Sequence, residues 1–376
     1  MFGRIREMLI KEFIQVFRDP QMSILIFIPP ILQLIVFGYA ASTDVKNIAT
    51  AIYDLDHSIE SRELVSRLAA SGYFDILYHV NSPDQITRLI DENKISTAIQ
   101  FNKGFSEKIR GNQTAVLQVI VDGTDSNTAS VVLNYGGKII QNYSSQILLE
   151  RIARQSGISQ EHTAVEDETR IWFNENLESQ YFYVPGLLAI IIMLITFLLT
   201  SMAVVREKEI GTMEQIMVTP ITSAEFILGK TVPFAIIGFM DMILIVTVAT
   251  LWFQVPIRGS LAVLFLSTFF YILSSLGFGL LISTISKTQQ QAMMTTFFFF
   301  FPATLLSGFT FPIENMPVVV QWLTYLNPMR YFLIIVRGIF LKGIGLDILW
   351  HQIGALAVIG IVTLWLASKR LHKTLT

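Results

Sequence analysis

The side chains that carry most enzyme chemistry are scattered or missing in this chain. It has no cysteine, which excludes thiol catalysis and thiolate metal sites. Its histidines include no His-x-x-x-His pair and stand far apart, at His57, His79, His162, His351 and His372. The sequence supports neither a zinc site nor a histidine-based triad, so we expect no catalytic residue and no metal ligand set.

Two short patterns resemble ligand-binding loops but lack essential residues. Gly229-Lys230-Thr231 matches the end of a phosphate-binding loop, yet Ala224 stands where its first glycine belongs. Asp122, Asp125 and Asn127 resemble the start of a calcium loop without its glycine or distal glutamate. We therefore expect no nucleotide or calcium on this chain, and we interpret the second pattern as a surface turn.

One ionisable side chain lies in the middle of an apolar run. Asp241 is the only ionisable residue between Lys230 and Arg258. A charge at the centre of a membrane span costs about 2.5–3.5 kcal/mol, which makes Asp241 a candidate functional residue. The alternative is structural: a protonated or hydrogen-bonded Asp241 joins helices through Ser, Thr or Gln, in bonds that average about 0.6 kcal/mol.

A dense charged stretch, residues 206–220, separates two apolar runs. The 27 residues between Glu178 and Arg206 carry no charge, and another apolar run opens at Lys230. Such a stretch is typical of a loop held at a membrane face, although an ordinary polar loop is an alternative that the pattern leaves open.

Capping signals divide this loop into helices. Thr212 with Gln215 forms a capping-box pattern, and Glu214 stands in the first turn, where the helix dipole favours negative charge. Thr219 precedes Pro220 and is pushed out of helical geometry. A second box, Thr222 with Glu225, begins the next long helix. The pattern predicts a short amphipathic helix between two long ones.

The composition is that of an integral membrane protein. The 376 residues are 52% hydrophobic and 15% charged, with a mean hydropathy of +0.54. Soluble domains carry about 25% charged residues. The net charge of -2 argues against nucleic acid as a partner.

The hydrophobic segments predict an α-helical membrane protein with six spans. Residues 1–21 form an amphipathic interfacial helix, and residues 22–42 form the first span. Residues 181–376 hold five more, at Tyr181–Val205, Val232–Trp252, Leu261–Ser286, Ala292–Phe311 and Leu346–Ala367. The proline-rich segment 312–345 is interpreted as external and re-entrant, with a seventh span as the alternative. Arg330 and Arg337 are seven residues apart in it and share one helical face.

Residues 43–180 differ completely from the rest and predict an α/β domain inserted between spans one and two. Strands are expected at 51–55, 74–80, 96–101 and 115–121, with helices at 58–70, 83–92 and 105–110 between them. This alternation favours a partly parallel sheet. A long helix at about 128–154 follows.

Lysine and arginine in the short loops predict the orientation. Eleven of them lie on the side of both termini and of the coupling loop, residues 206–230: Arg4, Arg6, Lys11, Arg18, Arg206, Lys208, Lys230, Lys287, Lys369, Arg370 and Lys373. Four lie on the other side: Arg258, Arg330, Arg337 and Lys342. The termini are therefore expected in the cytoplasm and the α/β domain outside it.

These pieces together resemble the type 2 ABC-exporter permeases of bacteria, particularly the multidrug branch, over nearly the whole chain. The resemblance is carried by the basic lead helix running into Phe17-Arg18-Asp19-Pro20, the Val121-Asp122-Gly123 segment, Arg206 to Gln215 with Thr219-Pro220, Ser307 to Pro317, and Leu326-Asn327-Pro328. The match at 206–220, together with one span followed by five, is its most specific part.

The resemblance implies a permease without an ATPase of its own. In that family a cytoplasmic ATP-binding subunit carries ATP and magnesium, and two permeases, identical or paralogous, share one pathway in the bacterial inner membrane. The residues that it assigns to ATPase coupling are Glu207, Glu209, Gly211, Thr212, Met213, Glu214, Gln215, Ile216, Met217, Thr219 and Pro220. Since an ATP-driven exporter needs no proton relay, we favour the structural role for Asp241.

The resulting prediction is the membrane subunit of an exporter that moves amphipathic or hydrophobic substrates, such as drug-like molecules or lipids, outward. One alternative is a membrane-anchored receptor with an external ligand-binding domain, for which one or two spans suffice, so the additional hydrophobic segments count against it. A membrane enzyme is a third class, and it lacks any recognisable constellation of catalytic residues.

Overall fold

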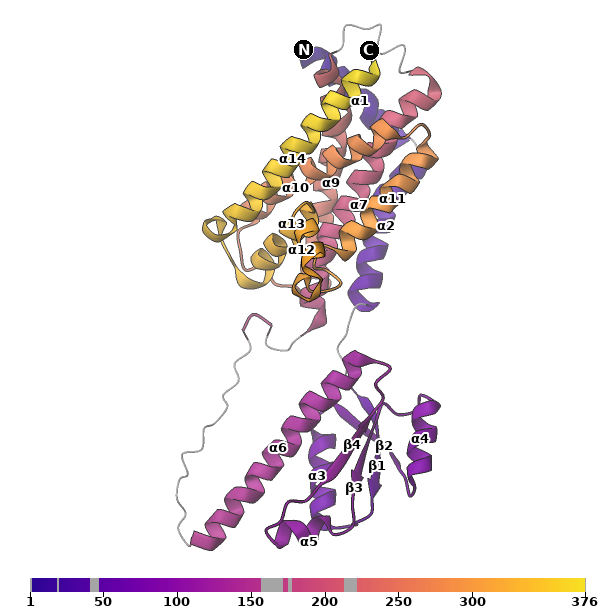
Figure 1. Cartoon of the computed structure of the whole chain (residues 1–376). Helices are drawn as coiled ribbons and strands as arrows, with labels where there is room; N and C mark the ends of the chain where they lie inside the picture. Colours follow the sequence, from indigo (N-terminus) through magenta and orange to yellow (C-terminus); the bar gives the residue numbers. More distant parts are fainter. Residues whose placement is uncertain are drawn as a thin grey trace. The chain divides into compact units, whose positions relative to one another are not determined.

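A computed structural model describes most of the chain, namely residues 2–18, 20–40, 47–156, 172–174, 178–212 and 222–375. The chain divides into two compact units. One is Thr43–Thr169, an α/β unit, and the other joins Met1–Ser42 to Arg170–Thr376 as a helical unit. Figure 1 shows the elements of both units.

The α/β unit is a four-stranded sheet with helices on both faces. Its elements are β1 (Ile48–Asp54), α3 (Ile59–Ala70), β2 (Phe74–His79), α4 (Pro83–Asp91), β3 (Thr97–Phe101), α5 (Phe105–Arg110), β4 (Leu117–Val121) and α6 (Ser126–Ser156). The strand order is β2-β1-β3-β4. β1 pairs parallel with β2 and β3, and β4 is antiparallel to β3, so the prediction of a partly parallel sheet is confirmed.

Alternation along β1 explains the two helical layers. Ile52 packs with Leu64 of α3 and Val132 of α6 on one face, while Ala51 packs with Ile86 of α4 on the other. Successive strand residues point to opposite faces, so a central strand covered on both sides buries residues of both faces.

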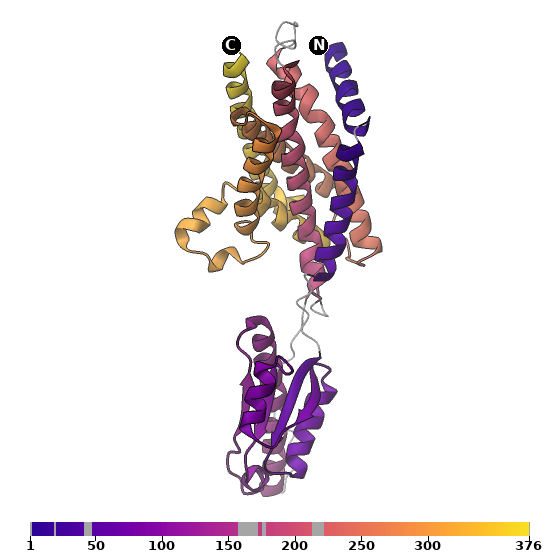
Figure 2. The ribbon, with the colours of Figure 1, turned by 90° about the vertical axis from the view of Figure 1, so that its right-hand side faces the viewer.

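The helical unit contains the long apolar helices. Its elements are α1 (Phe2–Arg18), α2 (Pro20–Ala40), α7 (Ser179–Ile210), α9 (Ser223–Leu251), α10 (Leu261–Ile285), α11 (Gln289–Leu305), η1 (Ile313–Asn315), α12 (Val318–Thr324), α13 (Pro328–Arg337), η2 (Gly338–Lys342) and α14 (Leu346–Leu375). Figures 1 and 2 show the long helices side by side. Both chain ends lie at one end of this unit, here named the terminal end, and α12 and α13 lie at the other, the distal end.

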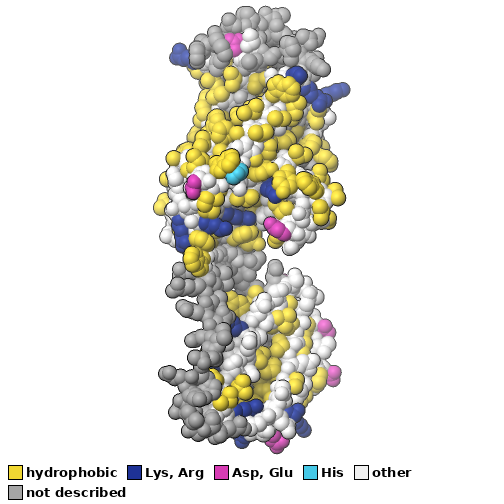
Figure 3. Space-filling model, turned by 60° about the vertical axis from the view of Figure 1, so that its left-hand side comes forward, with side chains coloured by type: hydrophobic (Ala, Val, Ile, Leu, Met, Phe, Trp, Pro, Cys, Tyr) yellow, Lys and Arg dark blue, Asp and Glu magenta, His cyan; other side chains and the backbone are white. Residues whose placement is uncertain are grey.

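Among the described residues, four helices are long and apolar enough to cross a membrane: α7, α9, α10 and α14. Helix α11 stops at Leu305, although the sequence predicts an apolar segment that continues to Phe311. It stops there because Gly308 adopts a left-handed conformation, φ +85°, and the Ser307 hydroxyl donates back to the Thr304 carbonyl. Figure 3 shows a largely apolar surface over the helical unit, as a lipid-facing surface requires.

Helix α7 lies at the centre of the helical unit. It packs against α2, α9, α10, α11 and α13, and most of its side chains are buried. Small and hydroxylated residues bind the helices together: Ser201 of α7 lies 2.9 Å from the Thr296 hydroxyl of α11, and the Tyr271 hydroxyl of α10 donates to the Ala189 carbonyl of α7 at 2.7 Å. Such bonds complement close packing where lipid provides no hydrophobic driving force.

The segment 312–345 consists of short helices, as the sequence predicts. Pro317 stands immediately before α12, and Pro328 is the first residue of α13. At the start of a helix the N–H group has no partner within the helix, so its absence from proline costs nothing. Helix α13 packs against α7, α10 and α14, whereas α12 leaves Val319 and Trp322 at least 70% exposed. The segment is therefore anchored by α13 and presents α12 at its surface.

Candidate functional site

A cluster of charged side chains is buried where α1, α7 and α9 meet at the terminal end. The Lys230 ammonium of α9 donates to Glu12 Oε1 of α1 at 2.6 Å and to Glu207 Oε1 of α7 at 2.8 Å. Lys11 of α1 donates to the same Glu207 oxygen at 2.9 Å. We name these four residues the tri-helix cluster, because they join α1 to two helices that follow it by more than 150 residues in the sequence, α7 and α9.

Three of the four charges are withdrawn from water. Glu12 is 3% exposed, Glu207 4% and Lys230 1%, whereas the Lys11 side chain is half exposed. At an effective dielectric of about 20, opposite charges at these distances attract by about 6 kcal/mol per pair. Desolvation costs several kcal/mol per ion, so the complete cluster is close to energetically neutral, while the loss of a single partner is expensive.

The cluster stands at the base of the predicted coupling loop. Gly211 ends α7 in a left-handed conformation, φ +82°, which a residue with a β-carbon adopts only with strain. The hydroxyl of Thr212, the next residue, donates to the Glu207 carboxylate and to the Glu207 carbonyl. The loop thus leaves α7 from a point bonded directly to the tri-helix cluster.

The loop returns to the helical unit at the start of α9. The Thr222 hydroxyl accepts from the Glu225 amide at 3.3 Å, and the Glu225 carboxylate accepts from the Thr222 amide at 2.9 Å. This reciprocal pair is the capping box that the sequence predicts, and it is confirmed. Lys230 follows about two helical turns later, so both ends of the loop are tied to the same cluster.

A second connection joins α7 to the turn between α10 and α11. The Gln289 side chain donates to Glu209 Oε2 at 2.7 Å, and the Lys208 ammonium donates to the Ser283 carbonyl at 3.0 Å. Consecutive residues at the end of α7 therefore contact different neighbours, Glu207 facing α1 and α9, and Lys208 and Glu209 facing α10 and α11.

Only part of the predicted coupling set can be placed. Glu207, Glu209, Gly211 and Thr212 lie at the end of α7, and the structure brings them together there. Glu207 is buried within the chain and holds its own helices together, so it does not present a surface to another subunit. The remaining predicted residues lie outside the described part of the chain: Met213, Glu214, Gln215, Ile216, Met217, Thr219 and Pro220.

The phosphate-loop pattern has a packing explanation. Lys230 is occupied by the tri-helix cluster, and the Thr231 hydroxyl donates to the Ile227 carbonyl at 2.8 Å. A β-carbon at Gly229 would lie 2.9 Å from the Met8 side chain, so this glycine allows α1 to approach α9 closely. The three residues serve helix packing in the middle of a helix.

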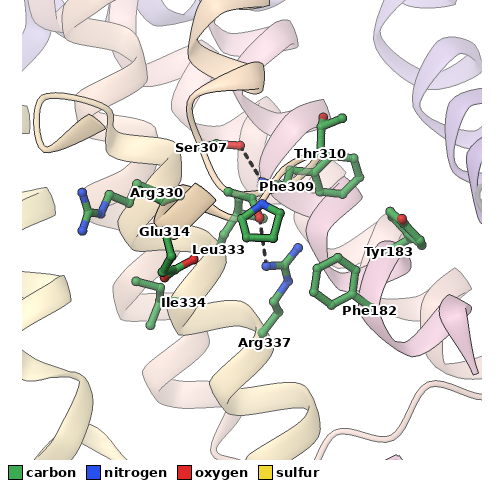
Figure 4. Close-up of a pocket in the computed structure, with 13 residues that line it drawn as sticks. Phe182, Tyr183, Ser307, Phe309, Thr310, Glu314, Arg330, Leu333, Ile334 and Arg337 are labelled. Carbon is green, nitrogen blue, oxygen red and sulfur yellow. Dashed lines mark hydrogen bonds between the residues drawn. The ribbon is translucent and has the colours of Figure 1, made fainter. Parts of the chain in front are cut away.

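A cavity of about 440 Å³ opens at the distal end between α7, the turn after α11, and α13. Its wall includes the aromatic rings of Phe182, Tyr183 and Phe309, and both Arg330 and Arg337 line it, as their shared helical face predicts. Figure 4 shows the Arg337 guanidinium at the centre of this wall, beside the Phe182 ring.

Comparison with known proteins identifies the family. A family model described as "ABC-2 family transporter protein" matches residues 21–369. The chain belongs to the ABC-2 transporter family. It is 38% identical to "Probable multidrug ABC transporter permease YbhR" of Escherichia coli over 363 residues, 96% of each chain. It is 35% identical to YbhS, named in the same words, over 98% of this chain and 97% of that one.

More distant relatives agree with this assignment. "Inner membrane transport permease YhhJ" of Escherichia coli is 27% identical over 92% of each chain. "ABC transporter G family member 20" of Dictyostelium discoideum is 22% identical over 89% of this chain but only 46% of its own length. The resemblance seen in the sequence is thereby confirmed, and the chain is a transmembrane subunit of an ABC transporter.

Asp241 occupies an unusual position in this permease. It is 0% exposed in α9, and neither of its carboxylate oxygens has a hydrogen-bond partner within the described residues. The structural role that we favoured requires a hydrogen bond from Asp241 to a Ser, Thr or Gln side chain. No such bond is present among the described residues. A buried carboxyl without a hydrogen-bond partner is costly, which keeps Asp241 a candidate for a functional residue.

Sequence reasoning missed the residues of α1 that complete the tri-helix cluster. Glu12 gave no signal, because an acidic residue in an amphipathic helix is normally solvated. Lys230 was counted as an inner-loop charge, although it is among the most deeply buried large side chains. Within the described residues no group of three or more His, Asp or Glu side chains could hold a metal ion.

Proposed function

We propose that this permease is the membrane subunit of an ATP-driven exporter of amphipathic or hydrophobic molecules. In this proposal α2 and α11 join the four candidate spans to make six, and ATP and magnesium are bound by a separate ATPase subunit. The names of two relatives, which describe multidrug permeases, support the substrate class. A second permease, identical or paralogous, completes the pathway in the bacterial inner membrane.

The proposed orientation has the terminal end in the cytoplasm and the α/β unit outside. The excess of lysine and arginine in the segments assigned to the terminal end supports it. The receptor alternative is not favoured, because an anchor needs one or two spans, and the described part of the permease already has four candidate spans packed into one core.

The observation that carries the coupling proposal is the tri-helix cluster. A displacement of the 206–230 loop by the ATPase acts on α7 and α9, to which its two ends belong, and on α1, which is bonded to both. Because α7 contacts most other helices of the unit, its movement alters the packing along the whole bundle. ATP hydrolysis by the separate ATPase subunit would in this way switch the transport pathway between access from the inside and access from the outside.

A charge reversal in the loop tests this function. Glu214→Arg is expected to reduce the amount of ATPase subunit that co-purifies with the permease and to lower export, with insertion and yield unchanged. Glu107→Arg is the matched control, because Glu107 is an exposed glutamate of the α/β unit and its reversal leaves the loop intact. Normal co-purification and export by Glu214→Arg would show that Glu214 merely stabilises its own helix, an effect of about 0.3–1 kcal/mol.

A further inference from the structure

The distal cavity contains an arginine whose hydrogen-bonding capacity is largely unused. Arg337 Nη1 donates to the Gly308 carbonyl at 3.3 Å, while Nε and Nη2 are buried and have no partner. These two nitrogens lie on one edge of the guanidinium and present parallel N–H groups, the fork that binds two oxygens of one carboxylate or phosphate. A buried donor without a protein partner is costly, so these two N–H groups are available to oxygen atoms that enter the cavity.

The backbone around the cavity holds this arginine in position. Gly308, at φ +85°, turns its carbonyl toward Nη1, and the Ser307 hydroxyl accepts from the Phe309 amide at 3.1 Å. On the other side the Phe182 ring packs against the guanidinium, with 3.7 Å between Cζ and the ring centroid. The guanidinium is therefore restrained before any ligand arrives, which lowers the entropic cost of binding.

The neighbouring charges favour an anion. Arg330 turns its guanidinium away from Arg337, toward the Thr324 hydroxyl and the Tyr325 ring, and its positive charge remains at the rim. Glu314 also lines the cavity but is exposed and forms no ion pair with either arginine. Solvent screens the negative charge of Glu314 more than it screens the positive charge of Arg337, which is shielded. The interior of the cavity therefore remains positive.

The walls and surroundings favour an anion that carries an apolar chain. Leu333 and Ile334 line the cavity beside its aromatic rings, and the adjacent α12 exposes Val319 and Trp322. An exposed apolar helix with tryptophan is typical of a segment lying in the membrane interface, at the depth of lipid headgroups. We propose that the distal cavity binds the phosphate headgroup of a membrane phospholipid, with the Arg337 fork holding two phosphate oxygens.

The contact with Phe182 leaves the binding edge of Arg337 available. The ring packs over the face of the guanidinium, whereas Nε and Nη2 present their N–H groups in its plane. A phosphate that approaches in this plane adds two charge-assisted hydrogen bonds and keeps the cation–π contact that restrains the arginine.

Binding of defined lipids to the purified full-length permease in uncharged detergent tests the proposal without the ATPase. The probes are dioctanoyl phosphatidylglycerol and dioctanoylglycerol, which has the same chains and no phosphate, and the dissociation constant is measured by calorimetry. Arg337→Gln is expected to weaken phosphatidylglycerol binding about 10- to 100-fold, the equivalent of two charge-assisted bonds. Arg337→Lys, which keeps the charge but loses the fork, is expected to recover only part of this loss.

Two further variants separate this site from general attraction of anions to a basic surface. Arg258→Gln, the same change at an exposed arginine that does not line the cavity, should leave the affinity unchanged. Glu314→Gln removes the negative charge beside the fork and should strengthen binding about twofold to fivefold. A wild-type elution profile in size-exclusion chromatography establishes that each variant is folded.

The outcomes divide clearly. Loss of binding in folded Arg337→Gln, with Arg258→Gln unaffected, supports the site. Equal binding of dioctanoylglycerol would overturn it by showing that the chains alone are recognised. Full competition by millimolar inorganic phosphate would overturn it by showing a site for the free anion. Equal affinity in wild type and Arg337→Gln would overturn it outright.

Discussion

The tri-helix cluster makes a quantitative prediction about two lysines that contact the same oxygen. Lys230→Met removes the only ion-pair partner that Glu12 has among the described residues, and it leaves two buried carboxylates with Lys11 alone. Removing one partner from a buried ionic group costs about 3–5 kcal/mol, because the remaining charge has lost its hydration without compensation. We therefore expect the free energy of unfolding of the helical unit to fall by that amount.

Lys11→Met is the matched control for this prediction. Lys11 binds the same Glu207 oxygen at 2.9 Å, close to the 2.8 Å of Lys230, but its side chain is 52% exposed against 2% for Lys230. Exposed pairs contribute about 0–1 kcal/mol, so the same substitution should have a much smaller effect. The difference between the two variants therefore measures burial, since distance and partner are nearly the same.

Unfolding in mixed detergent micelles, followed by tryptophan fluorescence, provides the assay. All five tryptophans lie outside the α/β unit, so the signal reports the helical unit. The triple variant Glu12→Gln, Glu207→Gln, Lys230→Met removes all three buried charges together and should return to within about 2 kcal/mol of wild type. Equal destabilisation by Lys230→Met and Lys11→Met would refute the reasoning, as would a triple variant less stable than Lys230→Met.

Three further predictions concern orientation, the buried carboxyl and acid stability. The chain has no cysteine, so single cysteines can be introduced at Ser126 and at Lys287. A membrane-impermeant thiol reagent should label the cysteine at 126 in intact cells and the cysteine at 287 only in opened cells. The reverse pattern would refute the proposed orientation. Asp241→Asn should retain both assembly and export if Asp241 is a protonated structural group, whereas loss of export at normal complex yield would reveal a functional carboxyl. Burial raises the pKa of Asp56, but hydrogen bonds from Ser58, Ser106 and Gly104 outweigh it and lower the pKa to about 2. The stabilisation of the α/β unit by Asp56 is therefore fully present above pH 3.8 and is lost as the pH falls toward 2. This pH dependence should be absent from Asp56→Ala. The exchange rate of the Gly104 amide, measured against pH in both proteins, tests it.

Much of the fold could be read from the sequence because it depends on local periodicity. Apolar runs of spanning length predict α7, α9, α10 and α14, and the alternation of short apolar strands with capped helices predicts the partly parallel sheet. The start of α9 at Thr222 was predictable because a capping box involves only neighbours in the chain. The shared face of Arg330 and Arg337 follows from helix geometry in the same way.

Only the tertiary structure determines which side chains come together in the tri-helix cluster and in the distal cavity. Lys230 and Glu12 are 218 residues apart, and no periodicity indicates that α1 would pack on α9 and carry a glutamate to a buried lysine. Likewise, the Gly308 carbonyl reaches Arg337 only because the turn after α11 folds back over α13. A residue's sequence neighbours determine its local conformation, whereas its burial and its partners depend on which distant helix covers it. For that reason Lys230, Glu207 and Arg337, polar residues that the sequence placed in loops or at a surface, became the buried charges of this permease.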